Sequence, residues 1–169
     1  TQVHGGMGFI EETGAAQFAR DVRVTAIYEG TNGIQAMDLT ARKLMDGGDA
    51  AFRILEEVHA GAEAAKASYP DLAEAVWQSV ETLRETTEWL VAQEDLTDRF
   101  AGAVPYLRAF ARVLGGHVHL ASAVSGDTSR ARLAAFYIKR ILPEHAGLLA
   151  HTREGAADLM AISADDLTA

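Results

Sequence analysis

The sequence predicts an all-α protein that folds as a helical bundle. Only three prolines, Pro70, Pro105 and Pro143, occur in 169 residues, and no segment shows the strict apolar–polar alternation of a β-strand. Apolar residues instead recur three and four positions apart, which places them on one face of a helix. These observations favour helix along almost the whole chain.

The first two helices are expected at residues 13–23 and 32–45. Asn32 can cap the second helix, with Gln35 three positions later, as in a capping box. The Asp-Gly-Gly sequence at 46–48 ends this helix, because glycine is the usual residue just past a helix end.

The third and fourth predicted helices are amphipathic. Asp49 can cap the third helix, whose apolar face consists of Phe52, Leu55 and Val58. The fourth helix begins near Pro70, because proline is tolerated in a first turn. Its apolar face is longer and consists of Leu72, Val76, Val80, Leu83 and Leu90. Faces of this kind are typical of helices that pack against a core.

The last two predicted helices contain the other prolines. The fifth runs from about Leu96, and Pro105 either kinks it or divides it in two. Its expected apolar stripe is Leu107, Phe110, Leu114 and Val118. A turn at 125–127 precedes the sixth helix, in which Pro143 is expected to introduce a kink. The apolar residues of the sixth helix are Leu133, Phe136, Tyr137 and Ile141.

The composition argues against several classes of function. A formal net charge of −9 argues against a nucleic-acid-binding surface, which needs a basic patch. The absence of cysteine excludes disulfides and thiolate metal sites and suits a cytoplasmic protein. No apolar run approaches the roughly 18 residues of a membrane span. The histidines are not spaced to share a helical face, so no metal site is predicted.

The most informative local feature is Tyr28-Glu29-Gly30-Thr31, in which one carboxylate lies between an aromatic residue and a glycine. Gly30 lets the backbone approach a ligand or adopt dihedral angles that are closed to other residues. The helix expected just after this segment has free N–H groups at its start, which favour a phosphate. The segment therefore offers a candidate general base, Glu29, and a candidate phosphate cradle. Taken separately, a glutamate in a loop is usually a solvated charge, and every helix has an N-terminus.

Two ordered blocks give these features a common context. The first is Gln2-x-x-Gly5-Gly6-x-Gly8-Phe9, continuing to Glu12, and the second is Arg20-Asp21-x-Arg23-Val24-Thr25-x-Ile27-Tyr28-Glu29-Gly30-Thr31. Together they resemble the C-terminal catalytic segment of the acyl-CoA dehydrogenases, flavoenzymes that form an α,β-double bond in acyl-CoA thioesters. Two positions depart from the family pattern. Gln17 stands where the family usually has a basic residue, and Gly33 stands where many members have a glutamine.

The resemblance implies a role for each site residue. Glu29 would remove the α-proton of the substrate in a dry pocket, and its backbone N–H would bind the thioester carbonyl. Tyr28 and Gly30 would line the acyl chain. The residues that would contact FAD are Gln2, Gly5, Gly6, Thr31 and, through its backbone N–H alone, Gly33. The resemblance also implies a homo-oligomer, in which Gln2, Gly5 and Gly6 contact the FAD of a neighbouring subunit, and electron-transferring flavoprotein as acceptor.

The resemblance divides the chain into two parts. Residues 1–45 are expected to end the catalytic helical domain, and residues 46–169 to form a helical C-terminal extension. The chain is expected to be a C-terminal fragment of a longer enzyme. Such extensions occur in a subset of the family that includes methylthiopropanoyl-CoA dehydrogenases, and their expected role is mainly packing or subunit contact. Two alternatives remain: a non-catalytic helical oligomerisation module, and a relative of the DNA-associated flavoproteins, against which the acidic charge speaks.

Overall fold

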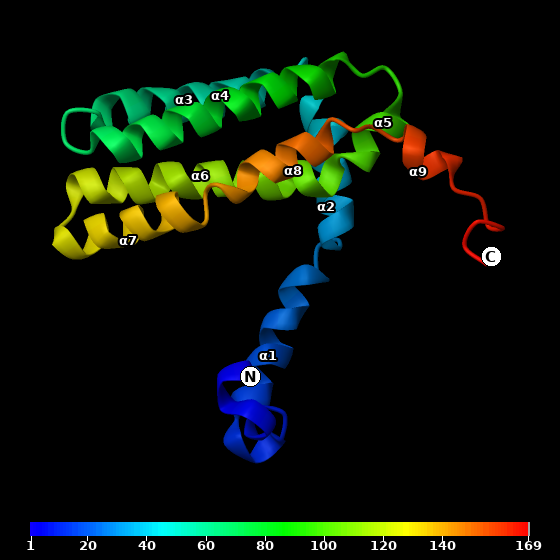
Figure 1. The fold of residues 1–169 in the computed structure, drawn as a ribbon, viewed down its shortest axis with the longest axis horizontal. Helices are drawn as coiled ribbons and strands as arrows, with labels where there is room; N and C mark the ends of the chain where they lie inside the picture. The colour runs from blue at the N-terminus through cyan, green and yellow to red at the C-terminus, as the bar shows by residue number, and fades with distance from the viewer. Residues whose placement is uncertain (169) are drawn as a thin grey trace. The chain divides into compact units, whose positions relative to one another are not determined.

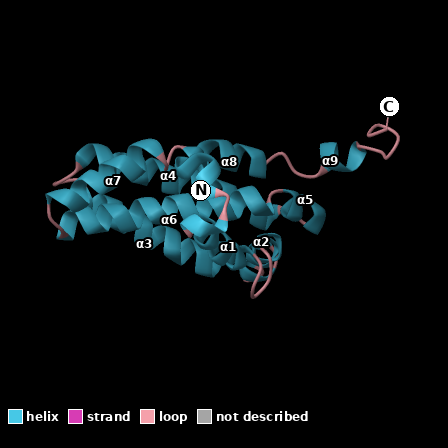
Figure 2. Cartoon of the chain, turned by 90° about the horizontal axis from the view of Figure 1, so that it is seen from below, coloured by secondary structure: helices cyan, strands magenta, loops and turns pink. Residues whose placement is uncertain are grey.

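The computed structural model describes residues 1–168 (Figure 1). Across these residues the chain forms α-helices, short 3-10 helices and connecting loops, without a β-strand (Figure 2). The all-α prediction is therefore confirmed. Contacts divide the chain into two compact units, Thr1–Gln35 and a larger one that starts at Ala36. None of the helices in the described part is both long and apolar enough to cross a membrane.

The first unit consists of short helices. Its 3-10 helices are Gln2–Gly8, Glu11–Thr13 and Val24–Ala26, and its α-helix is α1 (Ala15–Arg23). The Thr13 hydroxyl donates to the carbonyl oxygen of Met7 at 2.8 Å, which links the first two 3-10 helices. Gly14 adopts a left-handed conformation, with φ 72°, and turns the chain into α1. Only Gly8 and Ala16 are buried among residues 1–35, so this unit has almost no core of its own.

The second unit is a bundle built around α6. It begins within α2 (Asn32–Thr40) and continues with a 3-10 turn at Arg42–Leu44, α3 (Asp49–Ala65), α4 (Pro70–Ala92), α5 (Leu96–Ala101), α6 (Ala103–Ser125), α7 (Thr128–Arg140), α8 (Glu144–Thr152) and α9 (Ala157–Ala161). Helix α6 packs against α3, α4, α7 and α8. Figure 1 shows α3 and α4 as one antiparallel pair and α7 followed by α8 along α6.

The core of the second unit lies where α3, α4 and α6 meet. The largest fully buried side chains there include Leu55, Leu83 and Tyr106. Each fully buried leucine contributes about 1.5–3 kcal/mol of transfer free energy. Two buried hydroxyl groups are paired in this core: the Thr87 hydroxyl lies 2.8 Å from both the Leu83 carbonyl oxygen and the Tyr106 hydroxyl. Burial raises the pKa of Tyr106 to about 12.

The predicted faces of α3 and α4 are confirmed. Leu55 and Val58 are buried on α3, and Phe52 packs against the same core. On α4 every predicted apolar residue is buried, namely Leu72, Val76, Val80, Leu83 and Leu90. Pro70 is at the first position of α4, as expected.

The predicted faces of α6 and α7 are partly wrong. On α6, Phe110 is buried but Val118 is exposed, and the buried residues are Ala103, Pro105, Tyr106, Ala109, Phe110, Val113, Gly116, Leu120 and Ala123. On α7, Leu133 and Phe136 are exposed, and Ala134 and Ile138 are buried instead. Small residues occupy much of these faces because the helices approach closely. A Cβ atom at Gly115 would lie 2.1 Å from the hydroxyl of Tyr137 on α7.

Several predicted helix ends need correction. Helix α2 begins at Asn32 itself, and Thr31 takes the cap position, accepting the Ile34 N–H at 3.4 Å. Gln35 does not complete a capping box, because its side-chain amide donates to the carbonyl oxygen of Glu29. Helix α2 also ends at Thr40 rather than at residue 45.

The glycines and prolines explain the other differences. Gly48, with φ 84°, precedes α3, so Asp49 is its first residue and not its cap. Gly102 divides the predicted fifth helix into α5 and α6, and Pro105 lies in the first turn of α6. Pro143 separates α7 from α8 completely instead of kinking one helix.

Candidate functional site

The Tyr28–Thr31 segment connects the 3-10 turn at Val24–Ala26 to α2. Glu29 has φ 57° and Gly30 has φ 101°, so two successive residues adopt positive φ angles. A side-chain-bearing residue in the left-handed region costs about 1–2 kcal/mol, and such strain clusters at functional sites. The Gln35 side-chain amide donates to the Glu29 carbonyl oxygen at 2.5 Å and holds this conformation.

Gly30 fits this turn for two reasons. Its φ of 101° is an angle that other residues rarely adopt. A Cβ atom at this position would also lie 3.2 Å from the Gln35 amide nitrogen and 3.3 Å from the Ile34 Cγ2 atom. A larger residue would therefore disturb the bond that fixes Glu29.

The start of α2 presents polar hydrogens beside Glu29. Thr31 Oγ1 accepts the Ile34 N–H, and the Thr31 carbonyl oxygen accepts the Gln35 N–H. The N–H groups of Asn32 and Gly33 lie in the first turn of α2, where no carbonyl of the helix can accept them. They are therefore available to an anion. The Thr31 hydroxyl hydrogen is available as well.

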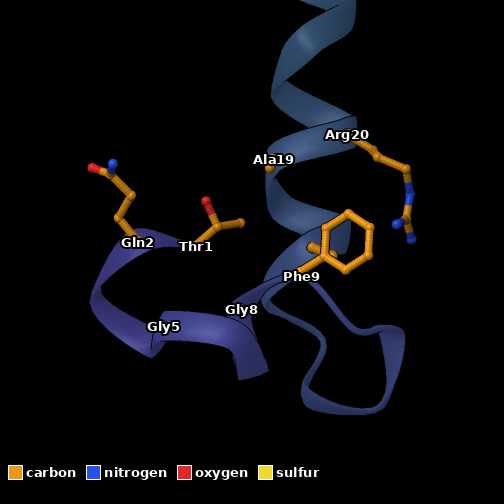
Figure 3. Close-up of a pocket in the computed structure, with 8 residues that line it drawn as sticks. Thr1, Gln2, Gly5, Gly8, Phe9, Ala19 and Arg20 are labelled. Atoms are coloured by element: carbon orange, nitrogen blue, oxygen red, sulfur yellow. The ribbon is translucent and has the colours of Figure 1, made fainter.

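The glycine-rich block forms a separate hollow of about 460 Å³ (Figure 3). Its lining residues come from the first 3-10 helix and from α1: Thr1, Gln2, Gly5, Gly8, Phe9, Ala16, Ala19 and Arg20. Figure 3 shows Thr1 and Gln2 on one side of it, and Phe9 and Arg20 on the other. Gly8 lets the backbone pass close to Thr1 at the edge of the hollow, because a Cβ atom at this position would lie 2.1 Å from the Thr1 carbonyl oxygen. The Arg20 guanidinium lies 3.5 Å from Glu11, an exposed ion pair that contributes little stability.

The structure therefore groups the predicted site residues in two places. Gln2 and Gly5 line the hollow, whereas Gly6 belongs to the same 3-10 helix without lining it. Tyr28, Glu29, Gly30, Thr31 and Gly33 follow one another around the turn into α2, and Tyr28 and Glu29 are exposed.

Sequence reasoning assigned no role to Phe9 or Arg20, which also line the hollow. Both lie inside the two motif blocks, so the motifs contained a signal for them. Across residues 1–168, no group of three or more histidine, aspartate or glutamate side chains is placed to hold a metal ion.

Family models match both parts of the chain. The model described as acyl-CoA dehydrogenase, C-terminal domain, matches residues 1–45 and so includes both motif blocks. The model described as acetyl-CoA dehydrogenase C-terminal like matches residues 54–163, which is more than half of the chain.

Curated relatives match across both units. The 3-methylmercaptopropionyl-CoA dehydrogenase of Ruegeria pomeroyi is 40% identical over 139 residues, covering 78% of this chain and 23% of that protein. The butyryl-CoA dehydrogenase of Syntrophomonas wolfei is 32% identical over 187 aligned residues, covering 95% of this chain and 29% of that protein. The broad-specificity linear acyl-CoA dehydrogenase FadE5 of Mycobacterium tuberculosis is 29% identical, covering 90% of this chain and 29% of that protein.

The chain thus spans about a quarter of the length of these relatives. No solved structure matches it significantly. The family models, the relatives and the two motif blocks agree, and the chain belongs to the acyl-CoA dehydrogenase family.

Proposed function

We propose that this chain is the C-terminal part of an FAD-dependent acyl-CoA dehydrogenase, in which Glu29 is the base. The observation that carries the proposal is the turn at Tyr28–Thr31. Glu29 has a left-handed backbone there, within the segment that matches the acyl-CoA dehydrogenase C-terminal domain. A non-glycine residue held in this conformation is a reason to infer function, because the fold must offset the strain.

The proposed reaction removes two hydrogens from the acyl chain of an acyl-CoA thioester. The Glu29 carboxylate takes the α-hydrogen as a proton, and the C–H electron pair forms the α,β-double bond. Bound FAD would supply the hydride acceptor for the β-hydrogen. The Glu29 N–H donates to the thioester carbonyl oxygen and stabilises the negative charge that develops there. Tyr28 and Gly30 lie on either side of Glu29 in the chain and would line the acyl group.

The residues present fit a dinucleotide such as FAD. Around Gly5 and Gly6 a Cβ atom would meet nothing within 4 Å, so a ligand can approach the backbone. The Thr31 hydroxyl and the N–H groups of Asn32 and Gly33 are donors suited to a pyrophosphate. Gln2 supplies an amide at the edge of the hollow and is proposed to contact the adenine end.

The remaining assignments follow from the same proposal. Residues 1–45 would end the catalytic domain, and residues 46–169 would form its helical extension. The substrate would be an acyl-CoA, as in the names of the relatives. We further propose a cytoplasmic homo-oligomer that passes electrons to electron-transferring flavoprotein, as the family resemblance implies.

Replacing Glu29 tests the proposal. In the full-length enzyme, Glu29→Gln keeps the size of the side chain but removes the base, so turnover should fall by about two orders of magnitude or more. Glu57→Gln is the matched control, because Glu57 is an exposed glutamate on α3, outside the proposed site. This variant should leave turnover unchanged. Butyryl-CoA and 3-methylmercaptopropionyl-CoA are the substrates to use, with a dye as electron acceptor. Bound flavin, measured by visible absorbance, should be equal in all three proteins.

Near-normal turnover of the Glu29→Gln enzyme, with flavin still bound, would rule out Glu29 as the base. Loss of flavin together with activity would instead place the residue in a folding or cofactor-binding role.

A further inference from the structure

Helix α7 has an outward face that is both basic and apolar. Leu133 and Phe136 are 52% and 60% exposed, although both are large apolar residues. Leu133, Phe136 and Arg140 follow each other at spacings of three and four, so they form one row along the helix. Arg132 lies one turn before Phe136, and both arginines are exposed. Large apolar residues exposed together on one helix mark an interaction site.

The charge of this face is opposite to that of the whole protein. Helix α7 contains four basic residues and no acidic residue, in a chain with a net charge of −9. None of these four cations belongs to an ion pair with an acidic side chain of residues 1–168. A partner for this face should therefore be acidic and apolar.

The C-terminal segment of the same chain has these properties. Residues 157–168 contain three aspartates and no basic residue. Their large apolar side chains are each more than half exposed, and they are Leu159, Met160, Ile162 and Leu167. The Asp166 carboxylate accepts the Ser163 N–H at 2.8 Å, which folds the end of the segment into a compact turn.

One chain does not bring its own segment and α7 together. The Ala156 N–H donates to the Asp98 carboxylate at 2.9 Å, which ties the start of the segment to α5. Figures 1 and 2 both show α9 beyond the α5 end of the bundle, with α8 between α9 and α7. To reach its own α7, the segment would have to double back along the whole of α8.

We propose that the C-terminal segment of one copy, residues 157–168, docks on the outward face of α7 in a second copy. Leu133 and Phe136 contact the apolar side chains of the segment, and Arg132 and Arg140 attract its aspartates. Two copies related by a two-fold axis each dock their segment on the other, so the same contact forms twice. Together the two contacts stabilise the dimer. The apolar contacts supply most of the affinity, and the charges set the orientation.

A spin label on the segment tests the contact directly. Because the chain contains no cysteine, Ala161→Cys gives a single labelling position. Spin-labelled chains are mixed with isotope-labelled chains that carry no spin label, so any broadening of an amide signal arises between copies. The amides of α7 should broaden, and those of α3 should not. Absence of broadening in the mixture, or broadening seen only when both labels are on one chain, would overturn the proposal.

Charge reversal tests the pairing independently. Arg132→Glu with Arg140→Glu should raise the dissociation constant for self-association, measured by sedimentation, at least about tenfold. The exposed Arg108 on α6 supplies the matched control, Arg108→Glu, which should have no effect. Mixing the doubly reversed chain with Asp165→Lys/Asp166→Lys chains should restore association. Circular dichroism and urea unfolding check that every variant is folded, and folded variants that associate unchanged, or reversed pairs that fail to re-associate, would refute the pairing.

Discussion

The buried pair of Thr87 and Tyr106 allows a quantitative test of how the bundle is held together. Thr87 Oγ1 lies 2.8 Å from the Leu83 carbonyl oxygen and 2.8 Å from the Tyr106 hydroxyl. The carbonyl can only accept, so the threonine hydroxyl donates to Leu83 and accepts from Tyr106. Both side chains are fully buried, so water cannot replace a lost partner.

Thr87→Val keeps the shape of the side chain but leaves the Tyr106 hydroxyl as a buried donor without an acceptor. The lost bond and the unpaired group should together lower the free energy of unfolding by about 2–3 kcal/mol. Tyr106→Phe leaves Thr87 bonded to Leu83 and should cost only about 1 kcal/mol. In the double variant no tyrosine donor remains unpaired, so its loss should be smaller than the sum by about 1 kcal/mol.

Urea unfolding of the four proteins, followed by far-ultraviolet circular dichroism, measures this coupling. Thr82→Val is the matched control on the same helix, because the Thr82 hydroxyl bonds only its own helix, at Gln78, near solvent. It should change the free energy of unfolding by less than about 0.5 kcal/mol. Equal losses for Thr87→Val and Thr82→Val, or strictly additive losses in the double variant, would show that the buried pair has no special role.

Three further outcomes are expected. Gly115→Ala should destabilise the chain in urea, because its Cβ would lie 2.1 Å from the Tyr137 hydroxyl, whereas Gly147→Ala, with nothing within 4 Å, should stabilise α8 by about 0.5–1 kcal/mol. The pKa of Tyr106 is raised from 10.0 to about 12 in the folded state, so up to about 3 kcal/mol of stability, fully present below pH 10, should be lost as the pH rises to 12. Tyr106→Phe should lack this loss. The 169-residue chain alone should purify without yellow flavin, because its few nucleotide contacts cannot offset the cost of association, and visible absorbance checks this.

Large apolar residues made α4 predictable. Leucine and valine recur along one face, and Pro70 marks the first turn, so periodicity alone identifies the buried side. Helices α6 and α7 approach each other so closely that glycine and alanine fill much of their contact. A pattern weighted by apolar size then selects Val118 and Phe136, which lie on exposed faces. Which face of a helix is buried depends on which helix packs against it. The apolar pattern of a single sequence does not identify that neighbouring helix.

The candidate site was predictable at the level of its motif. Gly30 is expected either to let the backbone approach a ligand or to adopt dihedral angles closed to other residues, and its φ of 101° agrees with the second alternative. The left-handed conformation of Glu29 was not expected, because a glutamate normally avoids it. It depends on Gln35, six positions later, whose amide reaches back to the Glu29 carbonyl oxygen. In a capping box the Gln35 side chain would instead bond the backbone N–H of the cap residue. The sequence pattern alone does not distinguish these two hydrogen bonds.

The first unit and the second differ in what stabilises them, and this difference bears on the proposed base. In the second unit one apolar face of α3 and one of α4 are buried in a common core. In the first unit Phe9, Phe18 and Tyr28 are more than half exposed, in the same segment as the strained Glu29. Exposed apolar surface of this extent is typical of an interface. Tyr28 directly precedes Glu29 in the chain, and both are exposed, so a partner surface that covers Tyr28 would also keep water from the Glu29 carboxylate. We therefore propose that the assembly that covers Tyr28 in the full-length enzyme also encloses Glu29, the proposed base.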